Sequence, residues 1–439
     1  MRFYNREKEI AALHEIHERS LENAQMTVVT GRRRIGKTQL LLRATEGQPT
    51  LYFFVARKAE TLLCQDFQQE IERKLGVPMV GRIESFGELF RYLMILSKSQ
   101  PFNLIIDEFQ EFYTVAPSTY SDMQNHWDYN KSESKMNLLL SGSVYSLMHK
   151  IFQGAKEPLF GRATAMIKVQ PFTTYTLKEI LADHNANYTS EDLLSLYAFT
   201  GGVAKYVQLL MDNGATTSTK MINHIIREES LFISEGKNML IEEFGKEYTN
   251  YFSILSSIAR GENTRAKIEA AVGREIGGYL TKMENDYSLI TKSLPIYAKT
   301  TTKNVRYILR DNFLTFWFRF IYKYSHIIEI GAYDQLKEIV KRDYPTFSGI
   351  ILERYFRERF IESKKYSRIG GYWDRKGEDE IDLIAVNEFD QTADIVDIKR
   401  KASNIKLELL NAKAIHLSST IGELSDYKFN IIGLSMEDM

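Results

Sequence analysis

Residues 31–38 read GRRRIGKT, and this octapeptide restricts the possible fold more than any other stretch of the chain. It lies between a β-branched run that ends at Val29 and helix-forming residues that begin at Gln39, so it predicts a strand-to-helix turn. Glycines at two fixed positions let backbone N–H groups surround phosphate oxygens, a lysine reaches the terminal phosphates, and a hydroxyl contacts Mg2+. The pattern GxxxxGK(S/T) is complete in Gly31, Gly36, Lys37 and Thr38. These residues predict a nucleoside triphosphate site.

The three consecutive arginines inside this loop leave a question open. Only the backbone of residues 32–35 is needed around the phosphates, and Arg34 belongs to the predicted site on that basis. The arginine side chains are then available for another purpose. They are either displayed to solvent, or they contact a partner protomer or nucleic-acid phosphate.

A triphosphate site also needs carboxylates from a neighbouring strand, and FNLIIDEFQ at residues 102–110 supplies them. We expect Asp107 to bind Mg2+ through water and Glu108 to polarise the attacking water, because phosphoryl transfer depends mainly on positioning and charge stabilisation. A third apolar run, residues 136–143, ends in Ser141 and Ser143. A serine there either senses the γ-phosphate or belongs to a simple Ser-Gly turn.

Length and composition limit the class of protein. At 439 residues the chain is too long for one compact core, so two to four domains are expected. Its 57 basic and 57 acidic residues balance, so any contact with DNA has to come from local patches. A single cysteine, Cys64, excludes a disulfide framework and a cysteine-based zinc site. Since there is no leader sequence and no run of about 18 apolar residues, we expect a cytoplasmic protein without a membrane span.

The order of the apolar runs predicts an α/β fold with a parallel sheet. A helix over residues 6–19, capped by Asn5, leads into the first strand. Helical stretches then alternate with strands, which is typical of a parallel sheet. The further strands are expected near residues 51–55, 104–107, 137–141 and 164–169. The alternation stops near Pro171, and residues 176–240 are predicted to be helical apart from a Gly-Gly interruption.

Residues 248–310 have a different pattern. Three helical stretches, the last in REIGGYLTKMENDYSLI, precede two strand-like pieces, LPIYA and VRYILR. This is the order of a winged helix-turn-helix, whose third helix can enter a DNA major groove with Arg274, Lys282 and Lys292 on the phosphates. Acidic residues on the same helix would repel DNA, so a protein-protein spacer is the alternative. The aromatic run 312–324 contains basic residues and predicts core packing.

A second group of polar residues lies near the C-terminus. Two strand-like runs, residues 380–386 and 393–401, are joined by the polar NEFDQTA. Asp397 and Lys399 are two residues apart and therefore point to one face of a strand. An antiparallel hairpin that sets Asp382 opposite either of them would bring all three side chains together. Two carboxylates and an ammonium can hold a divalent cation and orient water against a phosphodiester.

Glu353, on the preceding amphipathic helix, can complete this set of ligands. The candidate metal ligands are then Glu353, Asp382 and Asp397, and the candidate catalytic residues are Asp382, Asp397 and Lys399. The alternative is an exposed hairpin face that carries a salt bridge and no metal.

The chain as a whole resembles a known family. FYNREKEI, GRRRIGKT, LIIDEFQ, LLLSGS, PLFGRATAMIKVQPF, TGGVAKY and VRYILRDNFLTFWFRFIY are together similar to the archaeal-type ATPases of prokaryotes, relatives of the signal-transduction ATPases with numerous domains. The resemblance implies ATP and Mg2+ as cofactors, with Thr38 and Asp107 at the metal. It also implies an AAA-like P-loop domain (1–172), a helical lid (173–240), a winged helix-turn-helix (241–325) and a domain similar to PD-(D/E)XK nucleases, of the restriction-endonuclease type (326–439).

Three positions carry further implications of the resemblance. Arg162 stands where such ATPases often place an arginine finger that reaches a neighbour's nucleotide, and a structural arginine is the alternative. Ala204 replaces the proline of the family's GGxP stretch, so that turn is less fixed than in relatives. Ile381 stands where the name of the nuclease superfamily has proline, which is a common departure.

These features favour an ATPase whose Mg-ATP cycle rearranges the lid and the winged helix and, through them, a nuclease-like domain acting on DNA. The alternative is an ATP-dependent signalling switch or scaffold with a degenerate, non-cleaving nuclease-like domain. Such a switch would recognise DNA or a regulatory protein partner. A transcription regulator that reads DNA through residues 264–290 is a third class, and a homo-oligomer is compatible with each of them.

Overall fold

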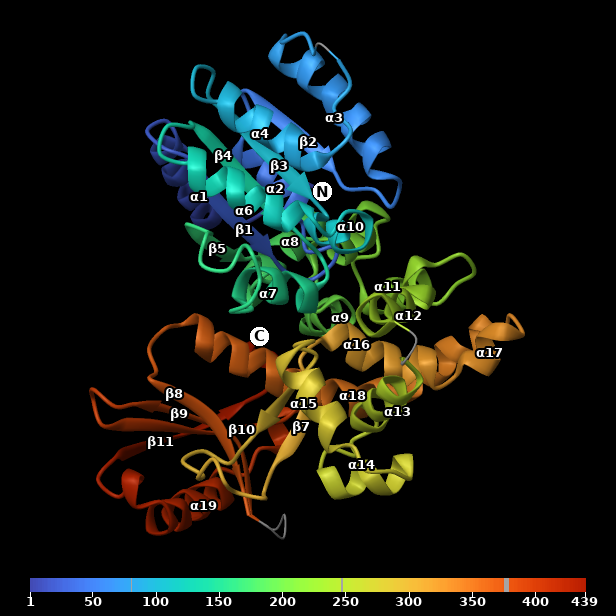
Figure 1. The fold of residues 1–439 in the computed structure, drawn as a ribbon. Coiled ribbons are helices and arrows are strands. Elements are labelled where there is room, and N and C mark those ends of the chain that lie inside the picture. Colours follow the sequence, from blue (N-terminus) through green and yellow to red (C-terminus); the bar gives the residue numbers. More distant parts are fainter. Residues whose placement is uncertain (80, 246–247, 375–378) are drawn as a thin grey trace. The chain divides into compact units, whose positions relative to one another are not determined.

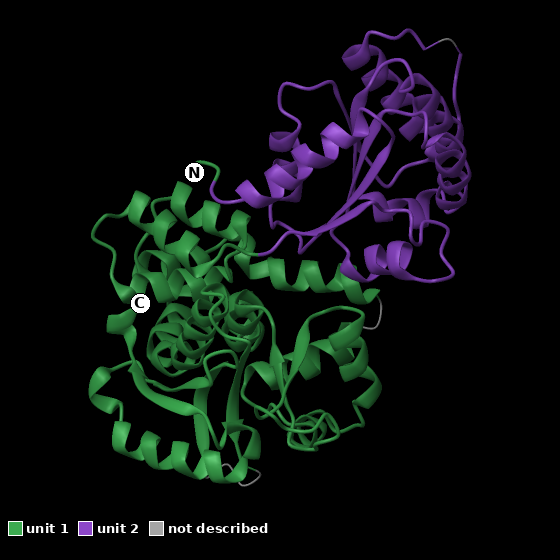
Figure 2. Ribbon diagram, turned by 90° about the vertical axis from the view of Figure 1, so that its left-hand side faces the viewer, with its two compact units in different colours: residues 1–3, 171–439 green, residues 4–170 purple. Residues whose placement is uncertain are grey.

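The computed structural model describes residues 1–79, 81–245, 248–374 and 379–439. These residues form two compact units, drawn in different colours in Figure 2. One unit is Tyr4–Gln170, and the other is Pro171–Met439 together with Met1–Phe3. The finer division of residues 173–439 into three domains stays a prediction.

The unit Tyr4–Gln170 is built on a parallel sheet of five strands in the order β2-β3-β4-β1-β5 (Figure 1). The strands are β1 (Gln25–Thr30), β2 (Thr50–Phe54), β3 (Phe102–Asp107), β4 (Met136–Ser141) and β5 (Ala165–Lys168). The three middle strands are almost entirely buried, as expected for a parallel sheet covered on both faces. The predicted alternation of strands and helices is confirmed.

The helices of this unit begin with the one predicted before the first strand. They are α1 (Glu7–Ser20), α2 (Lys37–Ala44), α3 (Glu60–Leu75), α4 (Phe86–Leu96), α5 (Phe112–Val115), α6 (Thr119–Asn130) and α7 (Tyr145–Gln153). Asn5 is not the N-cap of α1, which corrects the prediction. The cap position is Arg6, and the Asn5 side chain accepts a hydrogen bond from the adjacent Arg6 N–H at 2.8 Å. Asn5 has a positive φ of 55°, so its side chain turns to this N–H rather than to the first turn of the helix.

The position of β4 determines which loops meet. Strand β4 pairs in parallel with β1 on one side and with β3 on the other. Because the carboxyl ends of parallel strands lie at one edge of a sheet, three segments come together there. They are the glycine-rich loop after β1, the acidic pair at the end of β3 and the serines at the end of β4.

The second unit begins with the predicted helical stretch. Its helices are α8 (Thr174–His184), α9 (Ser190–Thr200), α10 (Ala204–Asp212), α11 (Ser218–Ile225) and α12 (Leu231–Phe244). The Gly-Gly interruption follows α9, and Gly202 has φ 73°. A Cβ atom on Gly202 would lie 2.6 Å from the Phe172 carbonyl oxygen, and the Phe172 N–H donates to the Gly202 carbonyl at 2.8 Å. Glycine is therefore required in this turn even though the neighbouring proline is replaced.

Residues 248–310 contain three helices and an antiparallel pair of strands, in the predicted order. They are α13 (Tyr248–Ala259), α14 (Arg265–Val272), α15 (Gly277–Asn285), β6 (Ile290–Ser293) and β7 (Arg306–Leu309). The third helix is shorter than predicted, and LPIYA is not a strand of this pair. Pro295 has no N–H for a ladder, and the Ile296 N–H donates to the Gly371 carbonyl at 2.8 Å. Ile296 is buried in the core of the C-terminal sheet, which explains the correction.

The aromatic run packs in the core, as predicted. It forms α16 (Asn312–Phe316) and a π-helical stretch, Trp317–Tyr322, in which most side chains are buried. Helices α17 (Ser325–Glu329) and α18 (Tyr333–Glu362) follow. Among the described helices, none combines the length and apolar character needed to cross a membrane.

The C-terminal region is a mixed sheet of four strands in the order β11-β10-β9-β8. The elements are β8 (Arg368–Trp373), β9 (Glu380–Asn387), β10 (Thr392–Ile398), α19 (Leu407–Thr420) and β11 (Lys428–Leu434). Strands β9 and β10 form the predicted antiparallel hairpin, and α19 connects β10 to the parallel strand β11. Figure 1 shows α19 against one face of this sheet.

The Gly-Gly turn gives a test of the fold. We expect Gly202→Ala to destabilise the second unit more than Gly214→Ala, because both glycines have positive φ but only Gly202 has a carbonyl oxygen in the way. A left-handed alanine costs about 1 kcal/mol at either site, and overpacking adds a further ~1–3 kcal/mol at Gly202. Urea unfolding of both variants, followed by circular dichroism, measures the difference. Equal losses of stability would contradict the packing argument.

Candidate functional site

The loop between β1 and α2 has the backbone that the glycine pattern predicts. Gly31 has φ 149°, Arg34 has φ 66° and Gly36 has φ 97°. A Cβ atom on Gly31 would lie 2.7 Å from the carbonyl oxygen of Val169, which follows β5, so this position accepts only glycine. The loop therefore needs glycine for both its conformation and its close approach to a neighbouring strand end.

Lys37 is the first residue of α2, and it is buried, with 6% of its surface exposed. Its Nζ donates to the carbonyls of Gly31 at 3.0 Å and Arg32 at 3.2 Å. Burial lowers the pKa of the Lys37 ammonium, while the charges of Glu108 and Asp107 oppose this shift. Two neutral carbonyls compensate the positive charge of a buried ammonium poorly, and negatively charged phosphate oxygens would be better partners.

Asp107, at the end of β3, accepts two hydrogen bonds on the same oxygen. Its Oδ2 lies 2.6 Å from Thr38 Oγ1 and 2.9 Å from the Tyr52 hydroxyl. A hydroxyl and a carboxylate side by side are the oxygen ligands that Mg2+ prefers, so the two predicted metal ligands fit the ion. Burial, together with Asp107, raises the pKa of Tyr52, which therefore keeps its proton.

Tyr52 is a residue that the sequence interpretation missed. It lies on β2, and Phe54 of that strand pairs with Asp107. The available signal was its place near the carboxyl end of a strand that neighbours β3. The local pattern around Tyr52, TLYFF, otherwise indicates only an apolar strand.

The Glu108 carboxylate accepts hydrogen bonds from two side chains. Its Oε2 accepts from Gln110 Nε2 at 2.5 Å and from Ser143 Oγ at 2.7 Å. Its backbone has a positive φ of 53°, which is uncommon outside glycine, and its N–H donates to Asp107 Oδ1 at 3.0 Å. Gln110 was also missed, although it lies two residues further along the same motif.

The two serines after β4 have different environments. Ser143 contacts Glu108, whereas Ser141 is buried and its Oγ has no hydrogen-bond partner among the described residues. A buried hydroxyl without a partner is unfavourable, and a phosphate oxygen at this edge of the sheet would satisfy it. The predicted role of Ser141 in sensing the γ-phosphate fits this observation and stays a prediction.

Arg162 makes contacts that favour its structural alternative. Its guanidinium pairs with both oxygens of Asp128, the shortest distance being 2.7 Å from Nη2 to Oδ2. Its Nη1 donates to the carbonyls of Pro158 at 2.6 Å and Phe160 at 3.2 Å. An arginine with these partners fixes the turn before β5, and it would have to lose them to act as a finger.

The C-terminal hairpin brings together the three residues predicted to converge. The register of β9 and β10 pairs Leu383 with Val396, so Asp382 and Asp397 are the next two residues opposite each other along the hairpin. Lys399 Nζ lies 2.9 Å from Asp382 Oδ2 and 2.6 Å from Asp397 Oδ1. Burial works to lower the pKa of Lys399, but its bonds to Asp397 and Asp382 outweigh this and raise it.

Glu353, on α18, is close enough to this cluster to interact with it. Burial raises the pKa of its carboxyl to about 8, with a further contribution from the Asp382 charge. Among the described residues, no three carboxylate, histidine or cysteine side chains are placed to hold a metal ion together. The Lys399 ammonium pairs with both aspartates, and the ligand set of Glu353, Asp382 and Asp397 stays a prediction.

The basic residues expected to contact DNA are mostly engaged within the protein. Lys292 Nζ lies 3.0 Å from Glu284 Oε2, and Arg274 Nη1 donates to Asn250 Oδ1 at 2.6 Å. Lys282, on α15, is exposed. The charge of Lys292 is offset by Glu284 of α15, whereas Arg274, before the helix, is bonded to a neutral amide and keeps its full charge.

The segment between β6 and β7, where a winged helix has its wing, is docked on the C-terminal sheet. Asn304 and Trp373 exchange two hydrogen bonds, of 3.1 and 3.0 Å. The Arg306 guanidinium lies 4.4 Å from the Trp373 ring centroid and 2.5 Å from Glu380 Oε1. This segment therefore covers the β8 edge of the sheet.

Two family models match the chain. Residues 3–210 match a family described as "ATPase domain predominantly from Archaea". The loop, the acidic pair and the sheet order agree with this match, so residues 3–210 are similar to archaeal-type P-loop ATPase domains. Residues 317–413 match a second family, described as "Archaea bacterial proteins of unknown function". The C-terminal part is similar to this second family, whose description names no activity.

Two individual proteins are similar over most of the chain. An uncharacterized protein of Methanocaldococcus jannaschii is 29% identical over 449 aligned positions, which cover 99% of this chain and 96% of the relative. The structure of a Walker-type ATPase of Pyrococcus abyssi is similar with a TM-score of 0.54 and 20% identity. That match covers 72% of this chain and 96% of the other. At this identity it supports the fold alone.

Lys37 provides the direct test of the nucleotide site. We expect Lys37→Ala to abolish ATP binding or turnover while the fold is kept, since Lys37 bonds only to loop carbonyls and contributes charge rather than packing. Arg43→Gln is a matched control, because Arg43 is an exposed basic residue on the same helix and pairs only with Glu46. Fluorescent nucleotide titration and phosphate release measure both variants. Wild-type affinity and turnover in Lys37→Ala would refute the assignment.

Proposed function

We propose that the unit Tyr4–Gln170 hydrolyses ATP with Mg2+. The observation that carries this proposal is the hydrogen bond of 2.6 Å between Thr38 and Asp107, beside the buried Lys37 ammonium. Thr38 and Asp107, whose side-chain oxygens lie 2.6 Å apart, would hold Mg2+, which would supply charge stabilisation to the phosphates. Lys37 would leave its two carbonyl partners for the β- and γ-phosphates.

Glu108 is the proposed group that polarises the attacking water. Water adds to the γ-phosphorus, the bond to the β–γ bridging oxygen breaks, and the proton of the water leaves toward the carboxylate. The bonds from Gln110 and Ser143 both end on Oε2 and hold the carboxylate in place. A carboxylate has a second oxygen with its own acceptor sites, so Oε1 could accept the proton of the water while these two bonds are kept.

Glu108→Gln separates binding from hydrolysis. The amide keeps the size of the side chain but cannot accept the proton, so turnover should fall by about 10²-fold or more while ATP stays bound. The matched control is Glu111→Gln, in which a nearby carboxylate that pairs with Arg57 is neutralised. Single-turnover hydrolysis and nucleotide retention on a desalting column measure the two steps. Turnover within a few-fold of wild type would assign the role to another residue.

We further propose that Asp382, Asp397 and Lys399 act on a phosphodiester of DNA. The support is their convergence, with both aspartates within 2.9 Å of one ammonium. Asp382 and Asp397 would hold a divalent cation once Lys399 moves aside, and the ammonium would then stabilise the negative charge that develops on the phosphate oxygens. Helix α15 and Lys282 would supply contacts to the DNA backbone, and ATP turnover would control access to the site.

The competing function is an ATP-dependent switch or scaffold whose C-terminal domain cuts nothing. Two observations favour it. Lys399 already neutralises the aspartates in place of a metal, and the segment between β6 and β7 is occupied by intramolecular contacts. The partner would then be a regulatory protein, DNA held without cleavage, or a second copy of the chain.

Asp382→Ala distinguishes the two functions. If the cluster is a nuclease, the variant should lose Mg2+- or Mn2+-dependent cleavage of DNA and keep its ATPase activity, because the ATPase residues lie in the other unit. Asp390→Ala is the control, since Asp390 lies in the loop at the opposite end of the same hairpin and is exposed. Gel assays on linear and supercoiled DNA with each metal measure cleavage. A wild-type protein that cuts no DNA under any of these conditions would favour the scaffold.

A further inference from the structure

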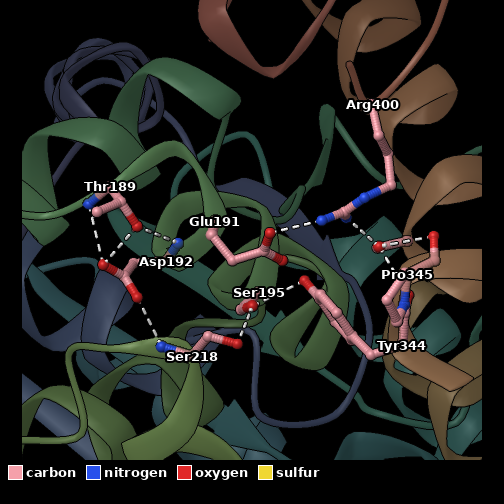
Figure 3. Close-up of polar contacts among 9 residues, drawn as sticks. Thr189, Glu191, Asp192, Ser195, Ser218, Tyr344, Pro345 and Arg400 are labelled. Carbon is pink, nitrogen blue, oxygen red and sulfur yellow. Dashed lines mark hydrogen bonds and ion pairs between the residues drawn. The ribbon is translucent and has the colours of Figure 1, made fainter. Parts of the chain in front are cut away.

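Arg400 directly follows Lys399, yet its side chain leads away from the candidate C-terminal site. Its Nη2 lies 2.5 Å from Glu191 Oε2, and its Nη1 donates to Ser348 Oγ. The guanidinium also lies 5.8 Å from the Tyr344 ring centroid. Figure 3 shows Arg400 reaching across to Glu191 on one side and to α18 on the other. One side chain thus connects the end of β10 to two helices far away in sequence.

The two helices hold these partners in fixed positions. Glu191 is the second residue of α9, whose N-terminus is closed by a capping box between Thr189 and Asp192. Asp192 also accepts from the Ser218 N–H at 2.7 Å, which ties the start of α11 to the same turn. Glu191 is therefore presented from a turn with little freedom to move.

A chain of hydroxyl groups joins the same helices below Arg400. The Tyr344 hydroxyl lies 2.7 Å from Ser195 Oγ, which donates to Ser218 Oγ at 2.8 Å (Figure 3). Ser348 Oγ donates to the Tyr344 carbonyl at 2.7 Å. Tyr344, Ser195 of α9 and Ser348 of α18 are all buried, so their hydrogen bonds are costly to break. Arg400 is attached to a rigid group of side chains rather than to a mobile surface carboxylate.

The other side of Arg400 is the candidate site itself. The Ile398 N–H donates to Asp382 Oδ2 at 2.9 Å, and Lys399 donates to the same oxygen at 2.9 Å. A shift of the chain at residue 400 would therefore move the two groups that hold the Asp382 carboxylate. Asp397, two residues before Lys399, would move with them.

We propose that Arg400 is a positioning residue, through which α9 and α18 fix the end of β10 and with it the geometry of Asp382, Asp397 and Lys399. The inference deepens the proposed action on DNA and rests on it for its chemical meaning. The helical region 173–240 would then help to set the geometry of the C-terminal site. Movement of α9 would be transmitted to Lys399 through one ion pair.

The test uses the full chain and a readout independent of cleavage. Arg400→Gln and Glu191→Gln should each speed hydrogen exchange of the Ile398 amide by about 10-fold or more, because that amide bonds directly to Asp382. Arg400→Lys, which keeps the charge and one donor group, should have a smaller effect. Exchange is followed by mass spectrometry on peptides that contain Ile398.

The matched control is Arg368→Gln. Arg368 lies on β8 of the same sheet, pairs with Glu388 at 3.6 Å and lies 4.4 Å from the Tyr297 ring centroid, so it loses the same kinds of contact. It should leave Ile398 exchange unchanged. The double variant Glu191→Arg, Arg400→Glu swaps the two charges of the ion pair. Hydrogen exchange of the Ile398 amide should be fast in either single variant and slow again in the double variant. A general loss of stability would not be reversed in this way.

DNA cleavage with Mn2+ is measured on the same variants. Loss of cleavage in Arg400→Gln, with recovery in the reciprocal double variant, would confirm the positioning role. If the wild-type protein cuts nothing but Ile398 exchange responds to Arg400, the proposed cleavage fails and the positioning role stands. If cleavage occurs and neither it nor Ile398 exchange depends on Arg400, the positioning role is overturned and the proposed cleavage stands. An equal response to Arg368→Gln would also overturn it.

Discussion

The second unit depends on hydrogen bonds made by partly buried polar side chains along α18. Glu362 accepts from both the N–H and the hydroxyl of Thr174, at 2.9 and 2.6 Å, and so holds the start of α8. Arg354, also on α18, donates to Asn312 Oδ1 at 3.1 Å and to Thr315 Oγ1 at 3.2 Å, which holds α16. Each of these groups would be costly to bury without its partner, so the partners fix where the neighbouring helices lie. The helical region, the aromatic core and the C-terminal sheet all pack on this one helix, which explains why they form a single compact unit.

The parts of the nucleotide site that the sequence predicted are those set by backbone rules. Gly31 and Gly36 are needed for conformations that other residues rarely adopt, and the strands before Thr38 and Asp107 are continuous apolar runs. The missed residues contribute through tertiary contacts alone. Tyr52 reaches Asp107 only because β2 lies next to β3, and this order of strands is not written in any local pattern. The C-terminal hairpin was predictable for the opposite reason, because two strand-like runs flank a short polar connection. The two-residue spacing of Asp397 and Lys399 predicted one shared face, while the register was left open and is set by the pairing of Leu383 with Val396.

The segment from β6 to β7 shows that a correct order of elements does not determine what the residues between them contact. Three helices and two strands are present, but the residues beyond β6 serve the neighbouring sheet. Pro295 cannot extend a ladder, and Ile296 gains more from burial beside the sheet than from exposure in a free loop. At the sheet edge, Asn304 then accepts a hydrogen bond from Trp373, and Arg306 forms an ion pair with Glu380. Together with the bond from the Ile296 N–H to the Gly371 carbonyl, these contacts occupy part of the β8 edge, which would otherwise be open to another strand.

The charge balance of the C-terminal cluster determines what the site can bind. Two aspartates and one lysine leave a net charge of about −1, and Glu353, with its pKa raised to about 8, adds no full negative charge at neutral pH. A divalent cation would have to displace Lys399 from both carboxylates, and its own charge would favour ionisation of Glu353 and so recruit a third oxygen ligand. Without the cation, Lys399 pairs with both aspartates and offsets one of their two negative charges. The cluster therefore has two electrostatically consistent states, and the position of Lys399 relative to the two aspartates decides between them.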